Sequence, residues 1–430
     1  MLEMQRKLTH AFYIVLSLPA TAMGFALCVQ ISALSWIMST KYHLNIEEVG
    51  FVWASGPIAG IVGQVLVGFI SDNVWFWGGR RRPFILVGGI LAALMLLALP
   101  NIDLVAQALG TANLLWIGIA VALLLDLSIN VSFNPTRSII ADVTPEGDPR
   151  TKGYTWMQTI SGMFGVLAYI IGAIWGNYAL IAVGIVLVLV FSIIPVLFVV
   201  EPRTLYSSST SSAERSQSSS SGKQAEAGLP TGTTDISQFI RICIAHAFSW
   251  LGVQTMFVYM FAYAKQILPP NTDDASIGRV IAISFAVLNT VGFILPVTVL
   301  EPFAERFGRV RTHLLALAIM ALGYVSVVLV GKSAIILYSL MVVIGVGWAA
   351  VVSLPFAIMT EKVDKNRMGL FMGIFNLSVV LPQLMSSLVI GKFIQDAADK
   401  SVIFVIAGVS LAISSALWLL VNEVEGGSAV

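Results

Sequence analysis

Four polar residues at helical spacing inside one long apolar run are the residues of this sequence best suited to chemistry. Asp126 follows the run Leu114–Leu125, so at about 1.5 Å per residue it lies roughly 18 Å into a helix. Asn130 lies one turn further on the same face, and Arg137 lies close to three turns further, with Asn134 between them. If this helix crosses a membrane, an ionised carboxylate at that depth costs at least about 2.5–3.5 kcal/mol. Asp126 must therefore face a water-filled path, be paired, or be protonated.

A proton carrier is the chemistry that this position favours. Because burial disfavours the charged form of a carboxyl group, Asp126 can take up a proton on one side of a membrane and release it on the other. The alternative is a structural aspartate held by hydrogen bonds from a neighbouring helix. Arg137 is either a charge partner of Asp126 or the residue that holds Asp142 at the end of the helix. We assign proton coupling to Asp126, Arg137 and Asn130.

The composition places these helices in a membrane. Hydrophobic residues make up 57% of the 430 residues and charged residues 11%, whereas an ordinary soluble domain carries about 25% charge. The net charge of +1 argues against nucleic acid, which needs a concentrated basic face. Cys28 and Cys243 both lie in apolar runs, so we expect no disulfide framework.

Twelve apolar runs are long enough to cross a bilayer core about 30 Å thick as helices. They lie near residues 11–39, 47–70, 83–99, 113–142, 151–176, 179–200, 238–268, 276–300, 313–331, 334–360, 368–394 and 401–421. A serine-rich stretch at 201–237 cannot bury enough apolar area to fold, which is typical of a linker. The sequence therefore predicts an all-α membrane protein with six-helix halves at 1–200 and 238–430, joined by a cytoplasmic linker at 201–237.

The basic residues predict the orientation. With the N-terminus inside, 17 lysines and arginines fall on the inner side and 6 on the outer side, and such an excess marks the cytoplasmic side. We therefore expect both termini in the cytoplasm. The compact linker and short termini suggest a bacterial protein, and hence the inner (plasma) membrane of the cell.

Acidic residues and basic turns recur at corresponding helix ends of the two halves. The positions are Asp72, Arg80, Arg81, Arg82 and Asp142 in the first half and Glu305, Arg306 and Arg309 in the second. We expect these residues to be gate elements that hold one side shut, and the alternative is that the basic loops only fix the orientation. Two six-helix halves in parallel repeat are typical of the major facilitator architecture, in which substrate binds near the midplane and the halves rock.

Amide side chains inside the spans are candidates for substrate binding. A sugar carries many hydroxyl groups, and each needs a hydrogen-bond partner once it leaves water. The candidates are Gln30, Asn134, Gln158, Gln254, Asn289, Asn376 and Gln383. The alternative is that the amides bond helix to helix, which is worth about 0.6 kcal/mol each. His246 is expected to be packed between helices, with a proton relay as its alternative.

Several stretches in both halves carry motifs of one known family: Gly56–Gly60, Gly68–Asp72, Gly79–Ile85, Leu125–Asn130, Arg137–Asp142, Leu288–Thr290, Ser353–Ala357 and Gly373–Gln383. They resemble the sucrose–proton symporters of plants and their animal and bacterial relatives, the glycoside–cation symporters of the major facilitator superfamily. The resemblance implies disaccharide uptake with protons, with Asp126 as the proton acceptor and Arg137 needed for transport. It also implies a role for Asp273 and Arg279 as an outer-loop pair. The aromatic loop 73–78 departs from the family pattern.

The expected function is import of a sucrose- or maltose-like α-glucoside together with protons, by alternating access. A uniporter or exporter, a sodium-coupled transporter and a sugar sensor without transport are the alternatives. The sequence has no metal-spaced cluster, glycine-rich phosphate loop or nucleophile elbow, so we expect no enzyme, no metal and no cofactor. The expected partners are the sugar, the proton and the lipid bilayer, without nucleic acid. A monomer is compatible with the sequence.

Overall fold

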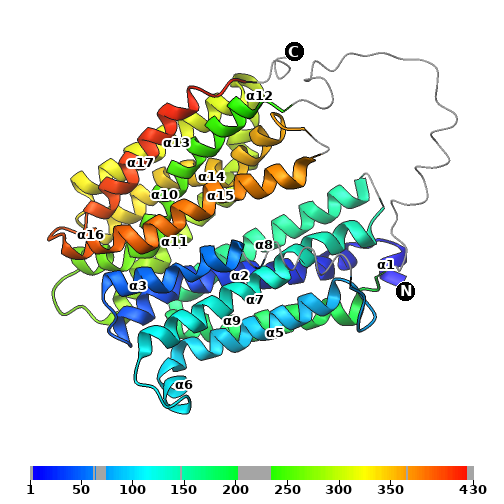
Figure 1. The fold of residues 1–430 in the computed structure, drawn as a ribbon, viewed down its shortest axis with the longest axis horizontal. Coiled ribbons are helices and arrows are strands. Elements are labelled where there is room, and N and C mark those ends of the chain that lie inside the picture. The colour runs from blue at the N-terminus through cyan, green and yellow to red at the C-terminus, as the bar shows by residue number, and fades with distance from the viewer. Residues whose placement is uncertain are drawn as a thin grey trace. The chain divides into compact units, whose positions relative to one another are not determined.

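The described chain is almost entirely helical. The computed structural model describes residues 3–61, 63, 74–145, 148–201, 234–364 and 367–423 (Figure 1). These ranges contain no β-strand, and Phe76 and Gly79 form an isolated bridge in a tight turn. The expected all-α membrane protein is confirmed.

Ten helices of the described ranges are long and apolar enough to cross a membrane. Before the predicted linker they are α2 (His10–Thr40), α5 (Arg82–Ala98) with η1 (Leu99–Asn101) and α6 (Ile102–Ala108), α7 (Leu114–Val143), α8 (Asp148–Trp175) and α9 (Asn177–Phe198). After it they are α10 (Ile236–Ile267), α11 (Asp274–Leu295) with η4 (Pro296–Leu300) and α12 (Glu301–Phe307), α13 (Arg309–Val330), α14 (Ala334–Thr360), and α15 (Met368–Met385) with η6 (Ser386–Ile390) and α16 (Gly391–Asp396).

The other two predicted spans are not among these ten helices. The last one is α17 (Val402–Trp418), a shorter apolar helix. The second predicted span, 47–70, begins with α3 (Ile46–Trp53), and its residues 64–70 lie outside the described residues. A short helix, α1 (Glu3–Arg6), precedes α2.

The chain divides into two compact units. The first unit contains Met1–Leu34, Ile58–Ile171 and Asn177–Gln224. The second unit contains Ser35–Pro57, Gly172–Gly176 and Ala225–Val430. The end of α2 and all of α3 therefore belong to the same compact unit as the helices that follow the predicted linker. The division into halves at 1–200 and 238–430 stays a prediction.

In the first unit, α5 packs against both α7 and α9 (Figure 1). Two adjacent glycines make these close approaches possible. A Cβ atom on Gly88 would collide with Ser132 of α7, and one on Gly89 would collide with Ser192 of α9. Small residues at helix crossings let membrane helices approach closely and gain van der Waals contact. The glycine pair thus fixes α5 as the central helix of this trio.

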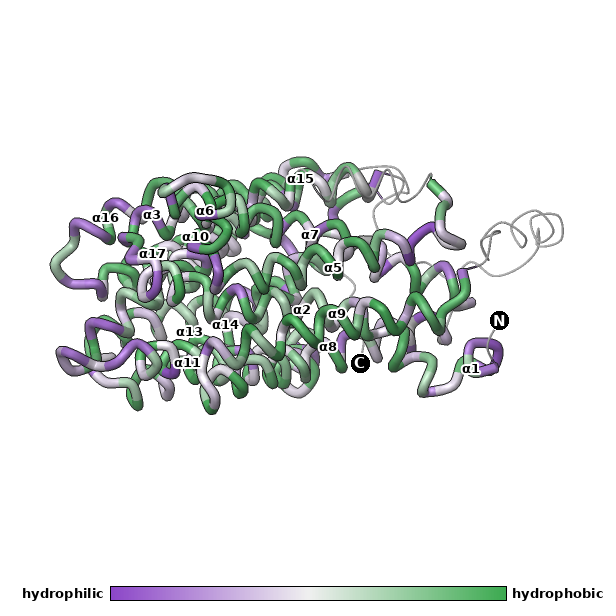
Figure 2. The backbone as a smooth tube through the Cα atoms, turned by 90° about the horizontal axis from the view of Figure 1, so that it is seen from below, coloured by the Kyte–Doolittle hydropathy of each residue, from purple (hydrophilic) through white to green (hydrophobic). Residues whose placement is uncertain are grey.

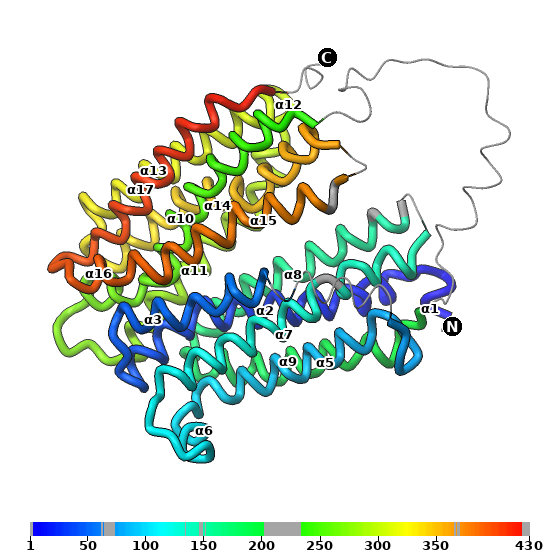
Figure 3. Tube along the Cα trace, in the orientation of Figure 1, coloured from blue at the N-terminus to red at the C-terminus, as the bar shows by residue number. Residues whose placement is uncertain are grey.

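The second unit repeats the same packing scheme. Its helix α13 packs against both α14 and α17, as α5 packs against α7 and α9 (Figure 3). In each trio the central helix therefore contacts the next long helix along the chain and the last helix before the predicted linker or before the end of the described chain. This recurrence is the expected consequence of a parallel repeat.

Hydrophobic residues extend along the helices, and hydrophilic residues gather in the connections and at helix ends (Figure 2). Large apolar side chains remain exposed on these helices, including Leu97, Trp116, Val186 and Leu322, which are 50–65% exposed. Such a surface is stable against lipid tails and unstable against water. The structure is therefore that of a multi-pass membrane protein.

Candidate transport site and helix-end charge clusters

Asp126 lies in the middle of α7 and is buried, with 5% of its surface exposed. Its Oδ2 accepts a hydrogen bond from Gln30 Nε2 of α2 at 3.0 Å. Gln30 is 2% exposed, and it supplies a donor without supplying a positive charge. The sequence identified both residues as candidates but gave them separate roles. The structure places them in direct contact within the first unit.

Asn130 is directed towards its own helix. Its Nδ2 donates to the main-chain oxygen of Asp126 at 2.8 Å. Asn130 also lies close to Gly63 of the first unit, since a Cβ atom on Gly63 would lie 3.0 Å from Asn130 Cβ. The side chain of Asn134 lies outside what the structure describes.

Arg137 is exposed on α7. Its guanidinium lies over the ring of Phe133, 5.0 Å from the centroid, and its main-chain oxygen accepts from the Tyr154 hydroxyl at 3.2 Å. Eleven residues of helix separate it from Asp126, a rise of about 16 Å. In this conformation the cation is too far along the helix for a direct pair with Asp126.

Asp142, at the end of α7, pairs with two arginines at the start of α5. Its Oδ2 lies 3.0 Å from Arg80 Nη2 and 3.2 Å from Arg81 Nε. The side chain of Arg80 is 18% exposed, that of Arg81 is 8% exposed and that of Asp142 is 10% exposed. Attraction between charges is screened little at such burial, so this contact holds α5 against α7.

Glu201 completes this group from the end of α9. Its carboxylate accepts from the backbone N–H groups of Arg80 at 2.7 Å, Arg81 at 2.9 Å and Arg82 at 2.7 Å. These donors have no partner within a helix, and a negative charge next to a helix N-terminus is stabilised by the helix dipole. We call Arg80, Arg81, Asp142 and Glu201 the first charge cluster. Arg82 belongs beside it, since its guanidinium donates to the Val196 carbonyl.

A second charge cluster has the same plan in the second unit. Arg309, at the start of α13, forms an ion pair with Glu361, which follows α14. Glu423 accepts from the backbone N–H of Arg311 at 2.9 Å and so caps α13. We call Arg309, Glu361 and Glu423 the second charge cluster.

Each capping glutamate is held by a glutamine clamp. Gln5 donates to the carbonyl of Val200 at 2.8 Å and accepts from its N–H at 3.0 Å, directly before Glu201. Gln238 accepts from the N–H of Asn422 at 2.9 Å, directly before Glu423. The sequence patterns did not identify these four side chains, and the only signal was an acidic residue within two positions of the end of the last apolar run of each half.

The remaining predicted gate residues lie elsewhere. Glu305 and Arg306 are exposed on α12, and the Arg306 guanidinium lies over the ring of Phe307 at 5.3 Å. Asp72 lies outside the described residues. Of the described residues predicted as gates, Arg80, Arg81, Asp142 and Arg309 thus lie in the two charge clusters and Arg82 lies beside the first. Glu305 and Arg306 lie on the exposed helix α12.

Amides and tryptophans meet in the second unit. Gln383 Nε2 of α15 donates to Gln254 Oε1 of α10 at 3.3 Å. Trp348 Nε1 of α14 donates to Asn289 Oδ1 of α11 at 3.3 Å, and the Trp348 ring contacts Trp250 edge-on at 6.1 Å. These residues come from four helices and combine flat apolar rings with amide donors and acceptors. A sugar ring offers the same combination of apolar face and hydroxyl edge.

Two further candidates are not in this group. Gln158 of α8 is exposed and Asn376 of α15 is half-buried.

His246 of α10 is 3% exposed, accepts from Trp250 Nε1 at 2.9 Å and stacks on Phe375 with centroids 4.9 Å apart. It is therefore packed between helices in this structure.

Asp273 has a structural task at the start of α11. Its Oδ1 accepts from the Ser276 N–H at 2.8 Å and its Oδ2 from the Ser276 hydroxyl at 2.7 Å, so it caps the helix. These hydrogen bonds hold the pKa of Asp273 below its usual value. Arg279, two turns further on, is exposed.

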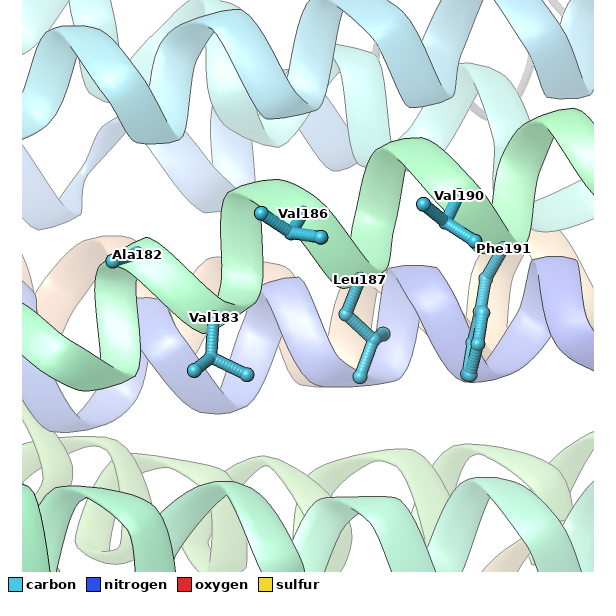
Figure 4. Close-up of a pocket in the computed structure, with 6 residues that line it drawn as sticks. All are labelled: Ala182, Val183, Val186, Leu187, Val190 and Phe191. Carbon is cyan, nitrogen blue, oxygen red and sulfur yellow. The ribbon is translucent and has the colours of Figure 1, made fainter.

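A shallow hollow on α9 is not suited to a sugar (Figure 4). Its lining is entirely apolar and comes from one helix: Ala182, Val183, Val186, Leu187, Val190 and Phe191. A sugar there would leave its hydroxyl groups without partners. Among the described residues, no group of three or more His, Cys, Asp or Glu side chains could hold a metal ion.

Residues 16–387 match the Major Facilitator Superfamily, and the chain belongs to that superfamily. It is similar to the sucrose transport protein SUT2 of Oryza sativa subsp. indica, with 26% identity over 87% of this chain and 85% of the relative. It is also similar to the general alpha-glucoside permease of Schizosaccharomyces pombe, with 26% identity over 36% of this chain and 31% of the permease.

Solved structures share the fold. The crystal structure of the D-xylose-proton symporter has a TM-score of 0.71 at 15% identity, covering 98% of this chain and 100% of the symporter. The nucleoside transporter NupG has a TM-score of 0.67 at 13% identity, covering 95% of this chain and 98% of the transporter. The expected major facilitator fold is therefore confirmed.

Proposed function

We propose that the protein is a proton-coupled symporter that imports a disaccharide of the sucrose or maltose type. The observation that carries this proposal is the buried carboxylate of Asp126, deep in α7, with the neutral amide of Gln30 as a hydrogen-bond partner. At this depth a carboxyl group costs much more free energy when it is ionised than when it is protonated. The names of the relatives, sucrose transport protein and alpha-glucoside permease, support the substrate class.

The amide–tryptophan group is the proposed sugar site of the second unit. Gln254 and Gln383 would exchange their mutual hydrogen bond for bonds to sugar hydroxyls, and Asn289 would do the same with its bond from Trp348. The rings of Trp250 and Trp348 would contact the apolar face of the sugar. Gln30, Gln158, Asn134 and Asn376 remain proposed contacts. Because Gln254 bonds to Gln383 and Asn289 bonds to Trp348, these amides have hydrogen-bond partners before a sugar binds.

The coupling follows from the charge of one side chain. With Asp126 protonated, the site is neutral and can change its exposure from one side of the membrane to the other. Release of the proton restores the charge. Arg137 then stabilises that charged state in a conformation that brings it closer to Asp126. Alternating access of this kind is how major facilitator halves move substrate.

The proposed topology keeps two six-helix halves, 1–200 and 238–430, joined by a cytoplasmic linker at 201–237. The 17 to 6 distribution of basic residues supports cytoplasmic termini, and the inner (plasma) membrane is the proposed location. The charge clusters then lie at the cytoplasmic helix ends. The proposed partners are a sugar, a proton and lipid.

Uptake into proteoliposomes tests the proposal. An imposed inward proton gradient should drive accumulation of labelled sucrose or maltose above its external concentration. Asp126→Asn should abolish accumulation and retain exchange of sugar for sugar, because the neutral amide mimics the protonated acid. A variant that still concentrates the sugar would show that Asp126 does not carry the proton.

The same vesicles separate the alternatives. Accumulation under a sodium gradient at clamped pH indicates sodium coupling, and equilibration without accumulation indicates a uniporter. Sugar binding without flux indicates a sensor. A binding panel of glucose, sucrose, maltose, lactose and trehalose then defines the substrate.

A further inference from the structure

His246 of α10 is a buried histidine to which neither the proposed sugar contacts nor the charge clusters give a task. It lies one turn before Trp250 and two turns before Gln254, and residues four apart share one face of a helix. Two residues of α15 meet this face: Phe375 stacks on His246, and Gln383 donates to Gln254. His246 is therefore the next side chain beside the amide–tryptophan group along α10.

Two neighbours fix the imidazole ring of His246. Phe375 stacks on it with ring centroids 4.9 Å apart and planes only 7° from parallel. Trp250 donates its indole N–H to Nε2 of His246 at 2.9 Å. Because an indole nitrogen can only donate, Nε2 carries no hydrogen, and the hydrogen of the neutral ring is on Nδ1. His246 is thus a fixed acceptor directed at one indole.

That acceptor holds the indole of Trp250 beside the indole of Trp348. The two rings meet edge-on, with centroids 6.1 Å apart and planes at 83°. Trp348 is fixed in turn by its hydrogen bond to Asn289 and by the close approach of Gly292, where a Cβ atom would lie 2.7 Å from Trp348 Cδ1. The result is a corner formed by two perpendicular, half-buried rings.

The bond to His246 also decides what Trp250 can offer a ligand. The indole N–H is the only polar group of that ring, and it is already bonded within the protein. Trp250 therefore presents an apolar surface, and the hydroxyl groups of a sugar must be bonded by the neighbouring amides. Trp348 differs, because Asn289 is proposed to exchange the bond from its N–H when a sugar binds.

We propose that His246 is a positioning residue of the sugar site: it holds the Trp250 indole at the angle that receives the apolar face of a sugar next to Trp348. The inference rests on the proposed function. His246 itself is 3% exposed and is covered by Phe375, so its effect on sugar affinity passes through Trp250.

Binding of sucrose and maltose to the purified protein tests this role. His246→Phe keeps an aromatic ring against Phe375 and removes the acceptor, so the Kd of the bound sugar should rise about three- to tenfold. His246→Gln returns an acceptor oxygen at a similar distance from the backbone and should keep the Kd within about twofold of the parent value. If His246→Phe does not fold, His246→Leu removes the same acceptor with a smaller side chain and takes its place.

The matched control is His313→Phe, which replaces another buried histidine of the second unit. The ring of His313 contacts Trp418 edge-on at 4.5 Å, with no hydrogen bond between the two rings. This variant therefore removes a buried imidazole without removing an acceptor from Trp250, and the Kd for the sugar should not change.

Combined variants separate positioning from a purely structural role. In a Trp250→Phe background, His246→Phe should change the Kd by no more than about twofold, because the donor that His246 holds is already absent. A histidine that only stabilises the fold would weaken binding equally in both backgrounds. Equal losses would overturn the proposal.

A spectroscopic measurement needs no sugar. Fluorotryptophan incorporated into the protein gives a fluorine resonance for each tryptophan, and Trp250→Phe identifies the resonance of Trp250. In His246→Phe this resonance should shift and broaden as the indole samples several rotamers, and in His313→Phe it should stay as in the parent. An unchanged resonance in His246→Phe would contradict the proposal. If the parent binds neither sucrose nor maltose, the proposed function fails, while the resonance still decides whether His246 fixes Trp250.

Discussion

The two charge clusters share a plan and differ in burial. In each, an acid at the end of one helix pairs with arginine at the start of a second, and a glutamate that follows a third helix caps that second helix. Arg81 and Asp142 are 8% and 10% exposed, whereas Arg309 and Glu361 are 50% and 33% exposed. The repeated plan specifies which helices meet, and the burial decides how much energy each contact contributes.

This difference follows from electrostatics. Breaking a buried pair leaves an uncompensated charge and costs about 3–5 kcal/mol, while exposed pairs typically contribute about 0–1 kcal/mol. The first cluster is therefore expected to act as a rigid part of its unit. The second is expected to separate easily, and substitutions at matched positions distinguish the two.

Replacing Glu201 should have the largest effect. In Glu201→Ala, the N–H groups of Arg80, Arg81 and Arg82 lose a buried acceptor, so the free energy of unfolding should fall by about 2–4 kcal/mol. Thermal unfolding of the purified protein in detergent measures the loss. Glu423→Ala is the matched control and should cost about 1 kcal/mol. Equal losses would contradict the role given to burial.

Asp142→Asn should have the next largest effect. The amide retains the shape of the side chain and an oxygen that accepts from Arg81, but it removes the negative charge. The cost should therefore be about 2–3 kcal/mol, less than the full cost of breaking a buried pair. The same unfolding measurement applies. If the free energy of unfolding fell by much less than about 1 kcal/mol, the Arg81–Asp142 pair would contribute no more than an exposed ion pair, contrary to the role given to its burial.

Glu361→Gln should have the smallest effect, below about 1 kcal/mol, because water already screens the pair with Arg309. Raising the salt concentration to about 1 M shortens the screening length to about 3 Å and should abolish this small difference. The effect of Asp142→Asn should persist in the same salt. Parallel salt dependence of the two variants would remove the distinction between the clusters.

The sequence predicted the spans well because each is a long apolar run, and lipid leaves a backbone few ways to satisfy its polar groups other than helix. It also identified Asp126, since a lone acid in such a run is conspicuous. It placed Arg80, Arg81 and Asp142 among the gate residues, but could not show that they contact one another.

Other parts of the site gave no local signal. Gln30 and Asp126 are 96 residues apart, and only the packing of α2 against α7 makes their hydrogen bond possible. Glu201 appeared to be the first residue of a linker, yet it is 6% exposed because α9 ends beside the first turn of α5. Its role depends on where two helix ends meet, which no local pattern encodes.

By itself the sequence determined that the protein is helical, spans a membrane many times and carries one acid deep in a span, because each of these follows from the local cost of placing polar groups in lipid. Only the tertiary structure decided which partner each polar group has: Gln30 for Asp126, Glu201 for the start of α5, and Asn289 for Trp348. A hydrogen bond needs its two atoms within about 3 Å, and in a bundle of helices that distance is set by packing between segments remote in the chain.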